Sequence, residues 1–76
     1  MNLERITSPS HPTYERALEL YQLSFPLHEQ RERFSQDAIL QDDAYHFDLV
    51  YDGDSFVGLV LYWEKSDYIY IEHFCI

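Results

Sequence analysis

The sequence predicts an α+β domain, in which helices cover one face of an antiparallel sheet. The prediction rests on the pattern of apolar and polar residues along the chain. A short alternating segment comes first, a long stretch with helical periodicity follows, and three segments in which every second residue is apolar come last. Hydrophobic residues make up 46% of the 76 residues and aromatic residues 17%, a composition typical of a folded core. A chain of this length forms at most one domain, and we assign residues 1–76 to a single domain.

The N-terminal part of the chain predicts a strand followed by a helix. Residues 2–6 (NLERI) place Leu3 and Ile6 among polar neighbours and predict a short first strand. The next six residues, TSPSHP, have the composition of a turn. A helix is then expected between Thr13, as the N-cap, and Pro26. Its apolar stripe at helical spacing consists of Tyr14, Ala17, Leu18, Tyr21 and Phe25.

A second helix is expected from about His28 to Leu40. Glu29 and Glu32 lie near its start, where the helix dipole favours acidic side chains. The side chains expected to face the core are Phe34, Ala38 and either Ile39 or Leu40. The sequence QDDA ends this helix, and the hydrophobic period then changes from about 3.6 to 2.

Three strands are expected at residues 45–51, 55–63 and 68–76. Short connections with hairpin composition separate them, so we predict an antiparallel meander. Gly58 lies inside the second of these strands, where a missing side chain allows a bulge or the close approach of another group. The alternative is a packing gap filled by a neighbouring Tyr or by Trp63. These strands are too apolar for water to cover both faces of the sheet.

The charge of the chain excludes some classes of partner. The chain has fourteen acidic and five basic residues, which gives a net charge of -9, and the basic residues do not cluster. This argues against binding to nucleic acid or to anionic membranes, since both require grouped Lys or Arg. The acidity is compatible with a cationic substrate such as an amine, although a surface kept soluble by acidic residues explains it equally simply.

The single cysteine and the N-terminal residues indicate a cytoplasmic protein. Cys75 has no second cysteine with which to form an internal disulfide, which favours a reducing compartment. Residues 1–20 carry charges where a signal peptide requires an apolar segment. No apolar run approaches the roughly 20 residues of a membrane span.

Metal binding and cysteine catalysis are not indicated. Residues 28–32 (HEQRE) superficially match a zinc-protease helix, but Glu32 stands where the second histidine is required. We therefore predict no metal site. Cys75 is interpreted as a buried thiol, because Phe74 and Ile76 beside it are apolar and supply neither a base nor a positive charge to activate a nucleophile.

Glu72 is the one carboxylate within the most apolar strand. Strict alternation places it on one face with Tyr70, Phe74 and Ile76, and places Ile71, His73 and Cys75 on the other. In a cleft, this carboxylate could act as a general base for a protonated amine. On an edge strand, it could instead prevent one sheet from associating with another. The residues alone leave both interpretations open.

Together these segments resemble the N-terminal half of the GNAT superfamily, the acetyl-CoA-dependent N-acetyltransferases. The resemblance covers essentially all 76 residues and rests on the order of the elements. Three stretches carry it: YERALELYQLSFPLHEQRERF as the two-helix substrate segment, FVGLVLYW as the strand with its Gly, and YIYIEHFCI as the fourth strand. It implies that an amine attacks the acetyl-CoA thioester directly, without a covalent enzyme intermediate.

The resemblance also implies roles for individual residues. Glu72 matches the place of a candidate general base. Main-chain atoms of Phe74, Cys75 and Ile76 would pair with the pantetheine arm of acetyl-CoA and polarise its thioester carbonyl. The residues assigned to the amine acceptor, a small molecule or a peptide, are Phe25, Glu29 and Tyr70.

The sequence departs from the family pattern after the fourth strand. The Gly-rich turn that holds the CoA pyrophosphate, the fifth strand and the fourth helix are not among these residues. We therefore expect a fold truncated after the fourth strand that binds acetyl-CoA poorly and does not catalyse transfer alone. One alternative is a non-catalytic interaction module that homodimerises through its exposed C-terminal strand. Another alternative is a complete small amine-binding domain. Such a domain needs a closed hydrophobic core within 76 residues, which is hard to build from strands that are apolar on both faces.

Overall fold

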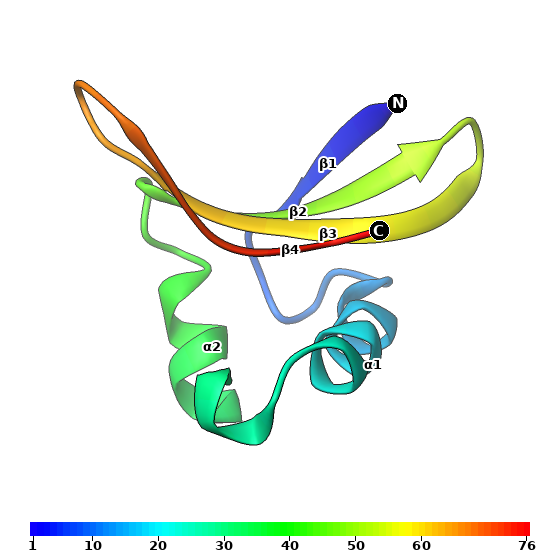
Figure 1. Ribbon diagram of the computed structural model, residues 1–76, viewed down its shortest axis with the longest axis horizontal. Coiled ribbons are helices and arrows are strands. Elements are labelled where there is room, and N and C mark those ends of the chain that lie inside the picture. The colour runs from blue at the N-terminus through cyan, green and yellow to red at the C-terminus, as the bar shows by residue number, and fades with distance from the viewer.

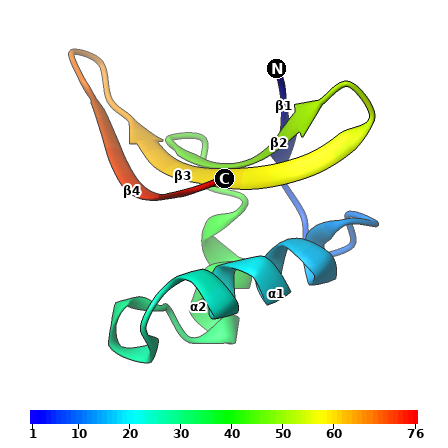
Figure 2. The ribbon, with the colours of Figure 1, turned by 45° about the vertical axis from the view of Figure 1, so that its right-hand side comes forward.

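A four-stranded antiparallel sheet carries the helices on one of its faces (Figure 1). The computed structural model describes all residues from Met1 to Ile76. The strands are β1 (Asn2–Ile6), β2 (Tyr45–Asp52), β3 (Ser55–Glu64) and β4 (Ile69–Cys75). The helices are α1 (Tyr14–Ser24), the 3-10 helix η1 (Leu27–Glu29) and α2 (Arg33–Ile39). Both views place α1 and α2 on the same side, so the sheet has a helix-covered face and an open face (Figures 1 and 2).

The predicted α+β architecture is confirmed. The strands lie in the order β1-β2-β3-β4, and each pairs antiparallel with its neighbour. The predicted bounds of the three meandering strands agree with the structure to within one residue. Gly53 begins the tight connection between β2 and β3 with a φ of 62°, a conformation that glycine adopts without strain.

Helix α1 forms as its apolar stripe predicts. Its buried residues are Tyr14, Ala17, Leu18 and Tyr21. Thr13 is the N-cap residue, although its side chain makes no capping hydrogen bond. Phe25 follows the helix in an extended conformation, because the residue before a proline is disfavoured in the helical region.

The second helix is shorter than predicted and is interrupted. Side chains replace helical hydrogen bonds in the segment between η1 and α2. The Gln30 amide donates to the carbonyl oxygens of Gln22 and Phe25, and the Arg31 backbone N–H donates to the Tyr21 hydroxyl. This segment, Gln30 to Glu32, is therefore held in an irregular conformation. No helix in the molecule is both long enough and apolar enough to cross a membrane.

The predicted inward face of the second helix is partly wrong. Phe34 is 82% exposed and Ala38 is also exposed, whereas Leu40 is buried as one of the two alternatives predicted. Gln36 occupies the inward position instead, and its amide donates to the Tyr45 hydroxyl at 2.9 Å. A buried polar side chain is tolerated when it is hydrogen-bonded, so this contact allows α2 to present Gln36 rather than Phe34 to the sheet.

The core lies between the helices and the covered face of the sheet. Eleven buried residues form one cluster there: Ile6, Tyr14, Ala17, Leu18, Tyr21, Leu40, Tyr45, Phe47, Leu49, Leu59 and Leu61. The open face instead exposes large apolar side chains from β1 and β4. These are Leu3, Ile69, Ile71 and Phe74, each more than half exposed. The expectation of apolar residues on both faces of the sheet is therefore confirmed.

Gly58 lies where the end of β4 passes close to β3. A Cβ atom at this position would lie 2.2 Å from the carbonyl oxygen of Cys75 and 2.8 Å from the Cα atom of Ile76. The pairing of β2 with β3 is also irregular here, where Val57 has no partner on β2. The alternative in which Trp63 or a tyrosine fills a gap is wrong, because backbone atoms occupy the space.

We expect Gly58→Ala to lower the free energy of unfolding by about 1–3 kcal/mol, because the added methyl group forces the end of β4 away from β3. Urea denaturation followed by circular dichroism measures this change. Gly53→Asn is a matched control: no atom lies within 4 Å of its added Cβ, and asparagine tolerates a positive φ, so its loss should be clearly smaller. A Gly58→Ala protein as stable as the wild type would contradict the close approach.

Candidate active site

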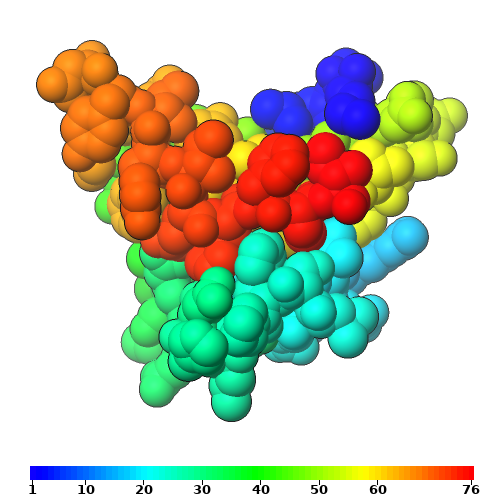
Figure 3. Space-filling view, viewed as in Figure 1, coloured from blue at the N-terminus to red at the C-terminus, as the bar shows by residue number.

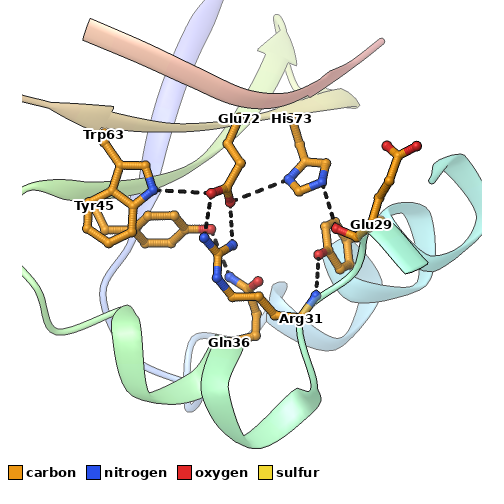
Figure 4. Close-up of polar contacts among 8 residues, drawn as sticks. Glu29, Arg31, Gln36, Tyr45, Trp63, Glu72 and His73 are labelled. Carbon is orange, nitrogen blue, oxygen red and sulfur yellow. Dashed lines mark hydrogen bonds and ion pairs between the residues drawn. The ribbon is translucent and has the colours of Figure 1, made fainter. Parts of the chain in front are cut away.

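A β-bulge in β4 brings two adjacent polar side chains to the helix-covered face. Leu61 pairs with His73 and Tyr62 pairs with Ile71, which leaves Glu72 as an extra residue on β4. Because of this extra residue, Glu72 and His73 both point toward the segment between α1 and α2 (Figure 4). The bulge thus creates a polar site on an otherwise apolar strand.

The predicted division of β4 into two faces is wrong after Glu72. Phe74 pairs with Val60 and lies on the open face, whereas Cys75 pairs with Leu59 and packs against the core. Strict alternation does not allow for an extra residue, so each position after the bulge moves to the other face. Cys75 packs against the core as expected, but its side chain is only partly buried rather than fully buried.

Three N–H groups hold the carboxylate of Glu72. The Arg31 guanidinium donates from Nη1 to Oε1 and from Nη2 to Oε2, and Trp63 Nε1 donates to Oε2 at 3.3 Å. The Arg31 and Glu72 side chains are only 24% and 19% exposed, so water screens this ion pair less than a surface pair. A bidentate ion pair of this kind also fixes the orientation of both side chains.

The pKa of Glu72 reflects two opposing effects. Burial alone would raise the pKa of this carboxyl group. The hydrogen bonds and positive charge of Arg31, together with the Trp63 N–H, outweigh burial and lower the pKa below its usual range. In turn, burial opposes the charge on Arg31, but its bonds to Glu72 raise the pKa of the guanidinium. Both groups are therefore charged at neutral pH.

His73 lies beside Glu72 and is almost fully buried. Its ring packs against the rings of Tyr21 and Phe25, with centroid distances of 5.3 Å and 4.6 Å. Nε2 lies 3.1 Å from the carbonyl oxygen of Glu29, and since a carbonyl only accepts, Nε2 carries a proton. In the neutral ring, Nδ1 is then an acceptor. It has no hydrogen-bond partner and lies 3.6 Å from Glu72 Oε1.

These side chains border a polar pocket between β4 and the segment after α1. The pocket has a volume of about 320 Å³ and is lined by Glu29, Gln30, Arg31, Glu72 and His73, with no hydrophobic residue. The space-filling view shows the residues of β4, in orange to red, meeting the segment between α1 and α2, in teal (Figure 3). No group of three or more His, Cys, Asp or Glu side chains is placed to hold a metal ion.

The structure brings together only some of the predicted site residues. Glu29 and Glu72 line the same pocket. Phe25 lies behind it, against the His73 ring, and Tyr70 is 57% exposed, pairs with Trp63 and does not line the pocket.

The three residues expected to bind acetyl-CoA lie at the end of β4. This strand is at the edge of the sheet and pairs only with β3. The backbone of Phe74, Cys75 and Ile76 along the outer edge therefore has no neighbouring strand. An edge of this kind can accept an extended ligand as an added strand.

Arg31, Trp63 and His73 are site residues that sequence reasoning missed. Arg31 is one of five basic residues that do not cluster in the sequence, and strict alternation places His73 on the face opposite Glu72. The one available signal is the pair of adjacent polar residues, Glu72 and His73, in an apolar strand. Such a pair is compatible with a bulge that turns both to one face.

The strand order, the two helices and the bulged edge strand define the N-terminal half of an acetyltransferase fold. A solved structure described as a putative acetyltransferase from the GNAT family, from Bacteroides thetaiotaomicron, is similar to this chain, with a TM-score of 0.90 and 28% sequence identity. The similarity covers 99% of this chain and 43% of the other, so this chain spans less than half the length of that protein. No protein-family model and no curated protein matches the sequence. The predicted N-terminal half of the GNAT fold is thereby confirmed.

We expect Glu72→Gln to lower the free energy of unfolding at pH 7 by about 1.5–3 kcal/mol, since it weakens charged hydrogen bonds. The pKa of Glu72 is lowered by folding, so its stabilising effect is present above the unfolded value of about 4.3 and is lost as the pH falls through the folded value. Urea denaturation of wild type and variant at pH 7 and at pH 3 should therefore show a difference that shrinks in acid.

The matched control is Glu15→Gln, because Glu15 also binds an arginine, Arg33, but its side chain is 69% exposed. This change should alter stability by less than about 1 kcal/mol at either pH, as for other surface pairs. An equal loss for Glu72→Gln at both pH values would show that the effect does not come from the charge of Glu72.

Proposed function

We propose that the 76 residues form the acceptor-binding half of an N-acetyltransferase, which transfers an acetyl group from acetyl-CoA to an amine. One observation carries the proposal: β4 combines a carboxylate at a bulge, facing a polar pocket, with a free strand edge a few residues further on. The similarity to the putative GNAT acetyltransferase supports the same reading.

The proposed reaction uses both features of β4. The nitrogen of the neutral amine attacks the thioester carbonyl carbon, a C–N bond forms and the C–S bond breaks. The nitrogen then gives its remaining extra proton to the departing thiolate, so that the products are the amide and the CoA thiol. An amine that arrives as an ammonium ion must first lose a proton. We assign Glu72 as the general base that takes this proton, directly or through a water molecule. Backbone groups of residues 74–76 pair with the pantetheine arm and donate to the thioester oxygen.

The predicted acceptor residues have different positions in this proposal. Glu29 lines the pocket and its carbonyl oxygen accepts from His73 Nε2, whereas its carboxylate points away from Glu72 (Figure 4). Phe25 acts through His73, because its ring fixes the imidazole from behind. Tyr70 precedes Glu72 by two residues on the same face of β4 and is exposed, so it would border a longer acceptor such as a peptide.

We propose further that these residues alone do not catalyse transfer. The CoA pyrophosphate requires several backbone N–H groups, which a Gly-rich turn at a helix N-terminus supplies. Of the two glycines, Gly53 lies in a hairpin and Gly58 lies inside β3. The similarity covers 43% of the structural neighbour, and we assign no binding of the nucleotide end of CoA to these 76 residues.

Titration of the 15N-labelled chain with S-acetylpantetheine and with acetyl-CoA tests this proposal. Both should shift the backbone amide signals of residues 74–76, with similar affinities weaker than about 100 μM, because pairing along one short strand edge gives modest binding. Acetyl-CoA that binds with micromolar affinity would contradict the proposed inactivity of the chain. Signals of residues 74–76 that do not respond to either compound would contradict the acetyl-CoA edge.

A second candidate function is a non-catalytic module that homodimerises through β4. The free outer edge of β4 and the exposed Ile69, Tyr70 and Ile71 favour it, because an unpaired apolar edge is a template for strand pairing. Sedimentation velocity at about 10–500 μM distinguishes a monomer from a homodimer. A monomer throughout this range would exclude the module, whereas a dimer that Ile71→Lys dissociates would support it.

A further inference from the structure

Two polar contacts join η1 and the residues directly after it to β4. At Glu29, the last residue of η1, the backbone carbonyl oxygen accepts a hydrogen bond from His73 Nε2 at 3.1 Å. Two residues further on, the Arg31 guanidinium donates to both carboxylate oxygens of Glu72. Because His73 and Glu72 are adjacent on β4, both contacts act at one point of the sheet (Figure 4).

The His73 ring is held firmly in the orientation that this contact requires. Its side chain is 8% exposed, and the rings of Tyr21 and Phe25 pack against it edge to face. A hydrogen bond in such surroundings is stronger than one exposed to water. The other nitrogen, Nδ1, lies 3.6 Å from Glu72 Oε1, which is an ion-pair distance but too long for a hydrogen bond. The one hydrogen bond of the ring is therefore the bond to η1.

The bonds between Arg31 and Glu72 depend on where the Arg31 backbone lies. A bidentate pair has a specific geometry, since both Nη atoms must meet both carboxylate oxygens. The Arg31 backbone N–H donates to the Tyr21 hydroxyl at 3.0 Å, and the Tyr21 ring contacts His73. Tyr21 on α1 and His73 on β4 thus support the same short piece of backbone from opposite layers.

We propose that His73 is a positioning residue for Glu72: its Nε2–H bond to the Glu29 carbonyl oxygen holds η1 against β4 and thereby places the Arg31 guanidinium on both carboxylate oxygens. This inference rests on the proposed function, in which Glu72 takes the proton of the acceptor. His73 acts through Arg31 and does not itself touch the acceptor. It sets how tightly Glu72 binds a proton, because the bonds from Arg31 stabilise the charged carboxylate.

The groups around Glu72 offer one other way for His73 to act. Burial raises the pKa of the Tyr45 hydroxyl, which keeps this neighbour neutral, and the carboxylate of Glu29 points away (Figure 4). Besides Arg31, the remaining source of positive charge is the His73 ring, which lowers the pKa of Glu72 by its charge when it is protonated. Positioning requires a donor at the place of Nε2, whereas this direct effect requires a cation.

Glutamine and methionine at position 73 separate the two effects. The amide nitrogen of glutamine lies as many bonds from Cβ as Nε2 does, so His73→Gln retains a donor for the Glu29 carbonyl oxygen. Methionine has a chain of the same length without a donor. Both variants are neutral and both lack the ring, so charge and ring packing are matched. We expect the proton affinity of Glu72 to rise about tenfold in His73→Met and less than about twofold in His73→Gln.

Two signals measure the effect by NMR. The 13C signal of the Glu72 carboxyl group, followed as the pH is lowered from 7, reports its proton affinity. At pH 7 the side-chain N–H signals of Arg31 should move toward those of a free arginine in His73→Met and stay in place in His73→Gln. His46→Met is the matched control, because the His46 ring is also mostly buried but stacks on Tyr62 and pairs with Glu64, away from the pocket. It should change neither signal.

A measurement on the wild type does not depend on any variant being folded. A long-range 1H–15N correlation spectrum shows which ring nitrogen of a neutral histidine carries the proton. We expect the proton of neutral His73 on Nε2. A proton on Nδ1 instead would overturn the proposal, because Nε2 could not then donate to Glu29.

Results with the variants can overturn it as well. Equal rises in His73→Gln and His73→Met would mean that the charge of the ring acts directly on Glu72. A folded His73→Met protein with unchanged Arg31 signals would mean that η1 keeps its place without the bond, and a rise in His46→Met would contradict a role specific to His73. None of these measurements uses an amine or acetyl-CoA, so their failure is distinguishable from failure of the S-acetylpantetheine test.

Discussion

The ion pair between Arg31 and Glu72 joins the two layers of this molecule at the one place where neither layer is regular. On one side is the bulge of β4, and on the other is the non-helical segment between η1 and α2. The guanidinium also lies over the Tyr45 ring, at 5.4 Å from its centroid, so the pair is anchored to the core through β2. The position of the pocket follows from this contact, because the pocket is bordered by these two irregular segments.

Much of the fold could be predicted from the sequence, because period and composition determine regular elements. The alternation in β2 and β3 and the stripe of α1 gave correct elements, and a close approach at Gly58 was one of the alternatives that the sequence left open. The bulge could not be predicted in this way. An extra residue leaves the composition of a strand unchanged, and strict alternation assigns every later side chain to the wrong face. This is why strict alternation assigns His73 to the face opposite Glu72, whereas the structure brings both side chains to the same face.

The error in the second helix has a different physical origin. Phe34 and Ala38 are apolar and lie four residues apart, so a helix that buries them is locally reasonable. Tertiary contacts decide otherwise, because Gln36 finds a hydrogen-bond partner in Tyr45, on a strand nine residues further along the chain. The predicted helix is likewise interrupted where Gln30 binds the Gln22 carbonyl oxygen on α1 and Arg31 binds Glu72 on β4. Hydrogen bonds between distant residues cannot be inferred from local periodicity, and here they determine both the break and the orientation of α2.

The same contacts limit what Glu72 can do as a base. The interaction with Arg31 stabilises the charged carboxylate. A carboxylate that is stabilised in its charged form binds a proton less tightly. A paired Glu72 is therefore a weak proton acceptor, as its lowered pKa indicates. Of the effects on this pKa, burial is the one that opposes the charge, so the ionised state of Glu72 depends on the bonds from Arg31 and Trp63. A base with so low an affinity for a proton holds it only briefly, which favours passing the proton of the acceptor on through a water molecule, the second route proposed for Glu72.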